Sequence, residues 1–244
     1  YQLPLGVVGI AVAVVLLPDL SRRLAAQDDV GARRALSRAG EVSLALTIPS
    51  AVALVVIPVN LVSVLFQRGA FGADDTLATA YAVSIYGFGL PAFVLQKVLQ
   101  PLYFAREDTR TPFRFAVVSM LVNIVVAVSM AYFLGFIGAA IGTTVAAWAM
   151  VFLLLGGTRS MGEVARFDER FYTRLWLICL AATFMGVALW GGAWALSPLF
   201  GLHGWRYLAL SILIVVGAVS YFGSGHVIGA FKLSEFRNAV RKKR

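Results

Sequence analysis

Residues 113–134 read FRFAVVSMLVNIVVAVSMAYFL and residues 138–157 read GAAIGTTVAAWAMVFLLLGG, with only Gly135-Phe136-Ile137 between them. Arg114 is the one charged residue in the two stretches. A bilayer core about 30 Å thick needs about 20 apolar residues of helix, and a helix in lipid satisfies its own backbone hydrogen bonds. We therefore predict two transmembrane helices joined as a tight antiparallel hairpin.

Five further apolar stretches flank this hairpin, so the predicted fold is all-α, a bundle of seven transmembrane helices. The first stretch is short and begins close to Tyr1, so we expect it to be the end of a longer helix. Strands are not a competing prediction, because the runs are too long and lack strict alternation. The seven predicted spans are 2–18, 42–66, 77–104, 113–134, 138–157, 175–196 and 205–231.

The connections between these spans alternate between Arg-rich and nearly Arg-free. The segments after the first, third and fifth spans and the C-terminal tail hold 5, 3, 4 and 6 Lys or Arg residues, whereas Arg68 and Arg206 are the only two in the other connections. Cationic loops stay on the cytoplasmic side of bacterial membranes. We therefore expect the first span to enter from outside and the C-terminus to be cytoplasmic.

The composition excludes several classes of protein. With 60% hydrophobic and 14% charged residues, the chain lies outside the soluble globular range. The net charge of +9 comes from loops that meet anionic lipid, so nucleic acid is not an expected partner. Cys179 is the single cysteine, which excludes an intrachain disulfide and a cysteine metal cluster. Two distant histidines and no paired intramembrane carboxylates make an enzyme improbable.

The longest connection, residues 19–40, interleaves leucine and alanine with arginine, which predicts a short amphipathic helix on the membrane surface capped by Asp28 or Asp29. Two of the six full-length spans contain prolines: Pro49 and Pro58 lie in the second span, and Pro91 and Pro101 in the third. A helix-interior proline removes a backbone hydrogen bond. Transporters use such breaks as hinges, so Pro91 and Pro101 are hinge candidates.

Lys97 is the only intramembrane lysine, and Gln96 and Gln100 lie beside it in the third span. A charge at that depth costs a few kcal/mol, of order 2–3, unless it faces water or a partner. One interpretation is a cationic group that faces an anionic substrate in a cavity. The other is a lysine that extends to the cytoplasmic interface or pairs with a carboxylate on another segment.

Asn123, Thr143 and Thr144 are the notable polar residues of the 113–157 hairpin. They are candidates for a hydrogen bond between the two helices or for a cation site. The GxxxG pattern from Gly138 to Gly142, and a second one from Gly225 to Gly229, predict close helix packing.

Three motifs carry a resemblance to a known family. They are LPLGVVGIAVAVVLLPDLSRRLA (3–25), LFQRGAFGADDT (65–76) and KVLQPLYFAREDTRTP (97–112). Together they resemble the MviN/MurJ family of bacterial lipid II flippases, within the superfamily that includes MATE-like drug exporters. That family has two six-helix lobes and two final helices.

The resemblance implies that this chain corresponds to about helices eight to fourteen of that family. The expected parts are residues 1–157 as a partial second lobe of five helices and 158–174 as a cytoplasmic linker. Residues 175–231 would form the final two helices with a lipid-tail groove, and 232–244 a basic cytoplasmic tail. The implied function is transport of lipid II across the bacterial inner membrane by alternating access, in cell-wall biogenesis, as part of a longer flippase.

The resemblance also implies site residues and partners. Lys97, Gln96, Gln100 and Gln2 would line a cavity for the diphosphate, although some relatives carry an acidic residue where Gln2 stands. Asn123 and Thr143 match a sodium site of some relatives, but Ala127 replaces its aspartate. The implied partners are lipid II, anionic lipids and the first lobe of the same protein. No cofactor or metal is expected, and coupling to sodium or protons stays open.

Three alternatives remain on the sequence alone: an exporter of another lipid-linked oligosaccharide or of drugs, a seven-helix receptor, and a non-transporting membrane scaffold. The last span, 205–231, has no lysine to carry retinal, which disfavours a photoreceptor.

Overall fold

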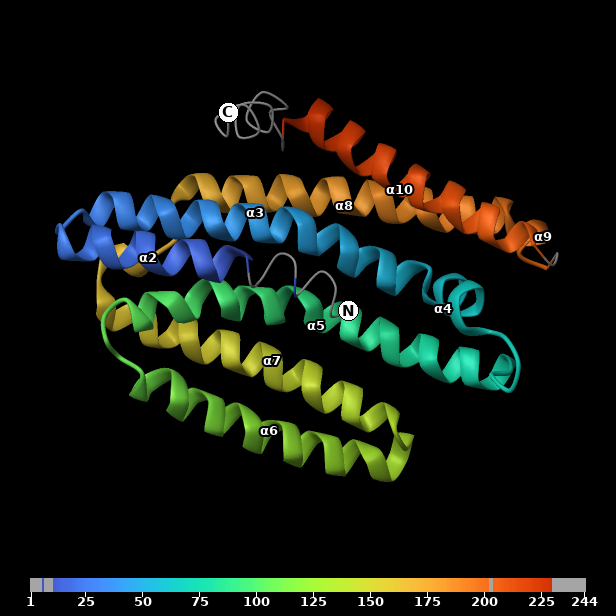
Figure 1. Ribbon diagram of the computed structural model, residues 1–244, viewed down its shortest axis with the longest axis horizontal. Coiled ribbons are helices and arrows are strands. Elements are labelled where there is room, and N and C mark those ends of the chain that lie inside the picture. The colour runs from blue at the N-terminus through green and yellow to red at the C-terminus, as the bar shows by residue number, and fades with distance from the viewer. Residues whose placement is uncertain (1–5, 7–10, 202–203, 230–244) are drawn as a thin grey trace.

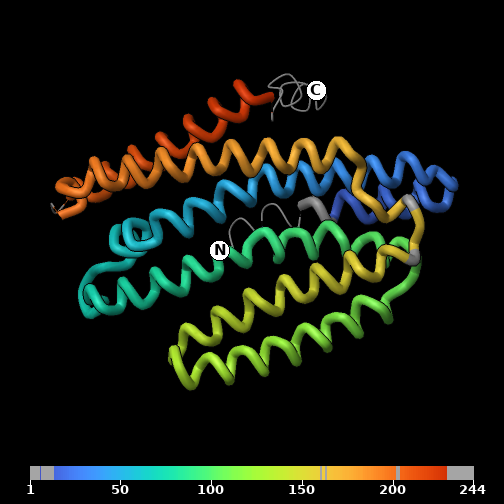
Figure 2. The backbone as a smooth tube through the Cα atoms, turned by 180° about the vertical axis from the view of Figure 1, so that it is seen from behind, coloured from blue at the N-terminus to red at the C-terminus, as the bar shows by residue number. Residues whose placement is uncertain are grey.

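The predicted hairpin is present in the computed structural model, which describes residue 6, residues 11–201 and residues 204–229. Helix α6 (Arg110–Leu134) turns at Gly135, whose φ of +57° favours glycine, and returns as α7 (Ile137–Thr158). Both views place α6 at the edge of the bundle, beside α7 (Figures 1 and 2).

The described residues form helices and no strand, which confirms the all-α prediction. Six helices are long and apolar enough to cross a membrane: α3, α5, α6, α7, α8 and α10. Residues 2–5 and 7–10 of the predicted first span lie outside the described residues, and α2 covers the second half of that span. The remaining bounds are α2 (Ala11–Ala25), α3 (Asp29–Val56), α4 (Pro58–Phe66), α5 (Ala73–Phe104), α8 (Glu169–Ala195), α9 (Ser197–Phe200) and α10 (Trp205–Ile228), with short 3₁₀ turns at Arg159–Met161 and Glu163–Ala165.

The prediction of a separate amphipathic helix within residues 19–40 is wrong. Helices α2 and α3 both run on through this segment and meet in a turn at residues 26–28. Asp28 caps α3 as expected, because its carboxylate accepts a hydrogen bond from the Gly31 N–H at 2.9 Å. Leu20 and Leu36 are fully buried against other helices, so they contribute to a protein core and do not face lipid.

Of the four prolines in the predicted second and third spans, only Pro58 coincides with a break. The chain leaves helical geometry at Ile57, and Pro58 starts α4 at a position where its missing N–H costs nothing. Helix α3 is continuous through Pro49, and α5 is continuous through Pro91 and Pro101. The prediction that these three prolines interrupt their helices is therefore wrong.

The Arg-rich connections lie together at one end of the bundle, on the left in Figure 1, and the connections that hold Arg68 and Arg206 lie at the other. We call these the Arg-rich end and the Arg-poor end. At the Arg-rich end Arg33 donates to the carbonyl of Phe167 at 3.1 Å, and Ser37 accepts from the N–H of Asp168 at 3.0 Å. These bonds attach α3 to the segment that leads into α8, which starts at Glu169 because Asp168 caps it.

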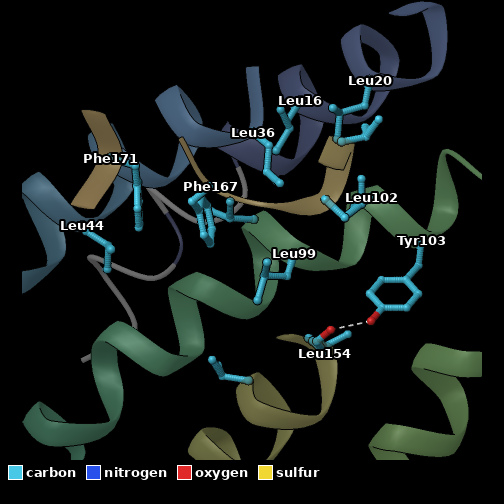
Figure 3. Close-up of a cluster of buried hydrophobic side chains, with 14 of the residues drawn as sticks. Leu16, Leu20, Leu36, Leu44, Leu99, Leu102, Tyr103, Leu154, Phe167 and Phe171 are labelled. Carbon is cyan, nitrogen blue, oxygen red and sulfur yellow. Dashed lines mark hydrogen bonds between the residues drawn. The ribbon is translucent and has the colours of Figure 1, made fainter. Parts of the chain in front are cut away.

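The core of this end joins α2, α3, α5, α7 and the start of α8 (Figure 3). Tyr103 of α5 is fully buried, and its hydroxyl donates a hydrogen bond to the carbonyl of Leu154 in α7. Phe167 stacks on Phe171 with ring centroids 4.0 Å apart. These contacts fix the helices that frame the cavities described next.

Candidate functional site

The largest described cavity lies between α2 and α3 at the Arg-rich end and has a volume of about 820 Å³. Apolar side chains, Val15, Leu16 and Val42 among them, line the part toward the middle of the helices, and charged side chains line the part toward the turn. The charged lining residues are Asp19, Arg22, Arg23, Asp28, Arg34 and Arg38. The cavity therefore combines a hydrocarbon wall with a cationic mouth.

The charges of this cavity are unevenly paired. Arg23 bridges Asp19 at 2.9 Å and Asp28 at 3.1 Å, and the hydrogen bond that Arg23 donates to the carboxylate of Asp19 raises the pKa of Arg23. Arg34 and Arg38 are exposed and form no hydrogen bond or ion pair with the described residues. Guanidinium groups bind phosphate through paired N–H donors, so these two arginines are available to an anion.

Lys97 is half-buried in α5, seven residues before the helix ends at Phe104 and thus about 10 Å from that end. Within the described part of the chain its ammonium group has no hydrogen-bond or ion-pair partner, and it lines neither the α2–α3 cavity nor either of the two cavities described below. Gln100 is half-buried too. Gln96 points elsewhere: its amide donates to the carbonyl of Ala147 in α7 at 3.0 Å.

The other candidate residues are not brought together as one site. Gln2 lies outside the described residues. The hydroxyl of Thr143 donates to Ala139 of its own helix at 2.8 Å, and Asn123 makes no hydrogen bond to a described residue. Thr144 does bond to another helix, but to the carbonyl of Ile85 in α5 at 3.0 Å and not across the hairpin. A side-chain hydrogen bond across the hairpin runs from Ser119 to the carbonyl of Ala146 at 2.8 Å.

A second cavity of about 280 Å³ is an apolar groove between α3, α8 and α10. Two polar side chains line it, and both are satisfied by backbone carbonyls: Ser50 donates to Leu46 at 2.9 Å, and Tyr221 donates to Ala45. The groove therefore presents hydrocarbon surface. The remaining lining residues are Ala45, Leu46, Pro49, Ala53, Ile57, Met185, Leu189, Leu213, Ile214, Gly217, Ala218 and Phe222.

Sequence reasoning missed two parts of this arrangement. Arg34 and Arg38 counted only as evidence of membrane orientation, although they lie four residues apart, with Val30 and Val42 at the same spacing, on one exposed face of α3. The wall that α3 contributes to the apolar groove has no sequence signal, because it depends on contact between helices far apart in the chain.

Comparison with known proteins supports one family. Residues 1–216 match the family model described as lipid II flippase MurJ. The chain is 40% identical over 245 residues to a probable lipid II flippase MurJ of Rhizobium meliloti (strain 1021), covering 99% of this chain and 46% of that protein. A similar protein of Vibrio cholerae (strain El Tor Inaba N16961), also named a probable lipid II flippase MurJ, is 33% identical over 229 residues, which are 88% of this chain and 44% of that protein.

The fold agrees with these sequence matches. A solved structure of lipid II flippase MurJ in an inward closed conformation superposes with a TM-score of 0.74 at 26% identity, covering 93% of this chain and 44% of the other. This chain thus spans less than half the length of the relatives that it matches. It is a multi-pass membrane protein, and it belongs to the lipid II flippase MurJ family.

Proposed function

We propose that this chain forms five helices of the second lobe and the final two helices of a flippase that moves lipid II across the bacterial inner membrane. The family match over residues 1–216 carries the proposal. A partner lobe would supply the other half of the transport pathway, because the matched relatives are more than twice as long. The proposed activity is transport by alternating access and involves no catalysis.

The two cavities suit the two parts of this substrate. Lipid II has a diphosphate and a sugar-peptide head that cannot cross hydrocarbon unaided, and a polyprenyl chain that can stay in lipid. Arg34 and Arg38 offer unpaired guanidinium groups at the mouth of the α2–α3 cavity, and Lys97 of α5 is a further, half-buried cation outside that cavity. The groove between α3, α8 and α10 offers a dry wall for the polyprenyl chain.

Orientation follows from the charge distribution. The Arg-rich end gathers the connections at residues 22–38, 106–114 and 159–174, and we place it in the cytoplasm, together with the C-terminus. The proposal needs no cofactor. Transport measured under a sodium gradient and under a proton gradient would identify the coupling ion.

The test is complementation in bacteria depleted of their own lipid II flippase. The chain is co-expressed with the first half of the Rhizobium meliloti relative, and we expect growth where either half alone gives lysis. Ala218 lines the apolar groove, while its neighbour Val219 faces away from it, 66% exposed. We expect Ala218→Trp to abolish growth and Val219→Trp to leave it unchanged, with equal amounts of both variants in the membrane. Failure of the unaltered pair of halves, both present in the membrane, contradicts the proposal.

A further inference from the structure

The two cations of the Arg-poor end, Arg68 and Arg206, line one cavity of about 540 Å³. Arg68 lies in the connection between α4 and α5, and Arg206 is the second residue of α10. Their convergence is a property of the fold, since 137 residues separate them along the chain. The other lining residues are Gln67, Gly69, Phe71, Phe200 and Gly201.

The guanidinium groups in this cavity have unused hydrogen-bond donors. Arg206 donates to the carbonyl of Gln67 at 3.2 Å and to the hydroxyl of Tyr207 at 3.3 Å, while its Nε is buried and has no partner among the described residues. Arg68 is exposed and makes no hydrogen bond or ion pair with a described residue. A buried N–H without an acceptor is costly, so an anionic acceptor would stabilise this arrangement.

Nearby carboxylates do not neutralise the cavity. Asp74 and Asp75 lie in the first turn of α5, where the carboxylate of Asp75 accepts the N–H of Gly72 at 2.9 Å, and neither residue lines the cavity. The site therefore keeps two positive charges on an end of the bundle that has few cations.

Exposed aromatic side chains place the cavity at the level of lipid head groups. Phe66, Trp205 and Tyr207 flank Arg68 and Arg206 in the sequence, and each is about half exposed. Aromatic residues gather at the membrane–water interface, with their rings at head-group depth. We expect a phosphate bound at this depth to belong to a lipid. The apolar rings beside the cavity can contact the acyl chains of a lipid, whereas a soluble anion gains nothing from them.

We propose that Arg68 and Arg206 form a binding site for the phosphate of an anionic phospholipid in the leaflet at the Arg-poor end. In this site Arg68 is the exposed guanidinium, and Arg206 is the one held in place by its bonds to Gln67 and Tyr207. The bound lipid would tie the α4–α5 connection to the start of α10. The inference does not depend on lipid II being the transported substrate.

The test reports on this end alone, because the Arg-rich end also attracts anionic lipid. A fluorophore is attached at Ala70→Cys in a Cys179→Ser background, and the full chain is placed in vesicles with spin-labelled phosphatidylglycerol or spin-labelled phosphatidylcholine. We expect stronger quenching by phosphatidylglycerol, and an affinity about tenfold weaker in Arg68→Gln, which loses a charged hydrogen-bond donor. Arg110→Gln, at the Arg-rich end, is the matched control and should leave quenching unchanged.

Three outcomes overturn the proposal. Equal quenching by the two lipids, or an unchanged preference in Arg68→Gln, would show that these arginines do not select a phosphate head group. Displacement of phosphatidylglycerol by excess inorganic phosphate, but not by chloride of equal ionic strength, would assign the cavity to soluble phosphate. Arg206→Lys keeps the charge but loses the forked donors, and we expect weaker binding with the chain still folded.

Discussion

Tyr221 of α10 donates its hydroxyl hydrogen to the carbonyl of Ala45 in α3, a residue 176 positions earlier in the chain. Tyr221 is 3% exposed, so the bond lies in a dry environment. It joins α10, the last described helix, to α3, and both residues line the apolar groove. A buried hydrogen bond thus links α3 and α10, two of the three helices that form the walls of a mostly apolar groove.

We predict that Tyr221→Phe destabilises the docking of α10 by about 1 kcal/mol, because the substitution removes one buried hydrogen bond and keeps the ring. Unfolding monitored in detergent is the measurement. Tyr132→Phe is the control, since Tyr132 is 87% exposed on α6 and bonds to no described residue. Equal stability of the two variants would mean that the Tyr221 bond contributes nothing.

The hairpin of α6 and α7 gives a second prediction. A Cβ added at Gly142 would lie 2.7 Å from the Cβ of Ala127 and 2.9 Å from its backbone nitrogen, whereas one added at Gly156 would meet nothing within 4 Å. We expect Gly142→Ala to destabilise the protein by about 1–3 kcal/mol through overpacking against the α6 backbone. Gly156→Ala, in the same helix, should be neutral. The measurement is the thermal stability of both variants. An unchanged stability of Gly142→Ala would contradict the close packing of α7 against α6 at this position.

The start of α6 should respond to acid. The carboxylate of Asp108 accepts the N–H of Thr111 at 3.0 Å, and this bond lowers the pKa of Asp108 below its ordinary value of 3.8. Because the folded pKa is depressed, the stabilisation is present above the ordinary value and is lost as the pH falls through the lowered one. We expect the hydrogen-exchange protection factor of the Thr111 amide to fall over that range. Asp108→Asn should remove the pH dependence, since asparagine also caps but does not titrate; the same acid transition in that variant would exclude Asp108 as its source.

Lys97 gives a functional prediction. In the complementation assay we expect Lys97→Ala to reduce transport about tenfold, as loss of one charged contact to a diphosphate would. Lys97→Arg should retain most activity because it keeps the cation. Full growth with the alanine variant, at equal protein level, would remove Lys97 from the transport site.

Much of the fold was predictable from length and polarity alone. The ends of α6 and α7 lie within a few residues of the predicted 113–134 and 138–157, because an apolar run bounded by a glycine turn has few alternative structures. The start of α3 was missed because Arg33, Arg34, Arg38 and Glu41 read as a polar connection. These residues are good helix formers, and once Asp28 caps the first turn the helix continues through them.

The sites were less predictable than the helices. Lys97 and the prolines could be chosen as candidates from the sequence because they are exceptions within apolar segments. The groove that Tyr221 and Ala45 line, and the cavity shared by Arg68 and Arg206, depend on contacts between distant segments. The spacing of residues along the chain does not predict contacts between distant segments. A single sequence also gives no co-variation between positions from which such contacts could be inferred.

The central proposal, a lipid II pathway with the polyprenyl chain in the α3–α8–α10 groove, is tested most directly by crosslinking in cells. A photo-reactive side chain is placed at Ala218, inside the groove, or at Val219 beside it, in the chain co-expressed with the first half of its relative. We predict lipid II, identified by the mass of its head group, on the Ala218 probe and only bulk phospholipid on the Val219 probe. Bulk phospholipid on both probes, in cells that accumulate lipid II, would contradict the proposal.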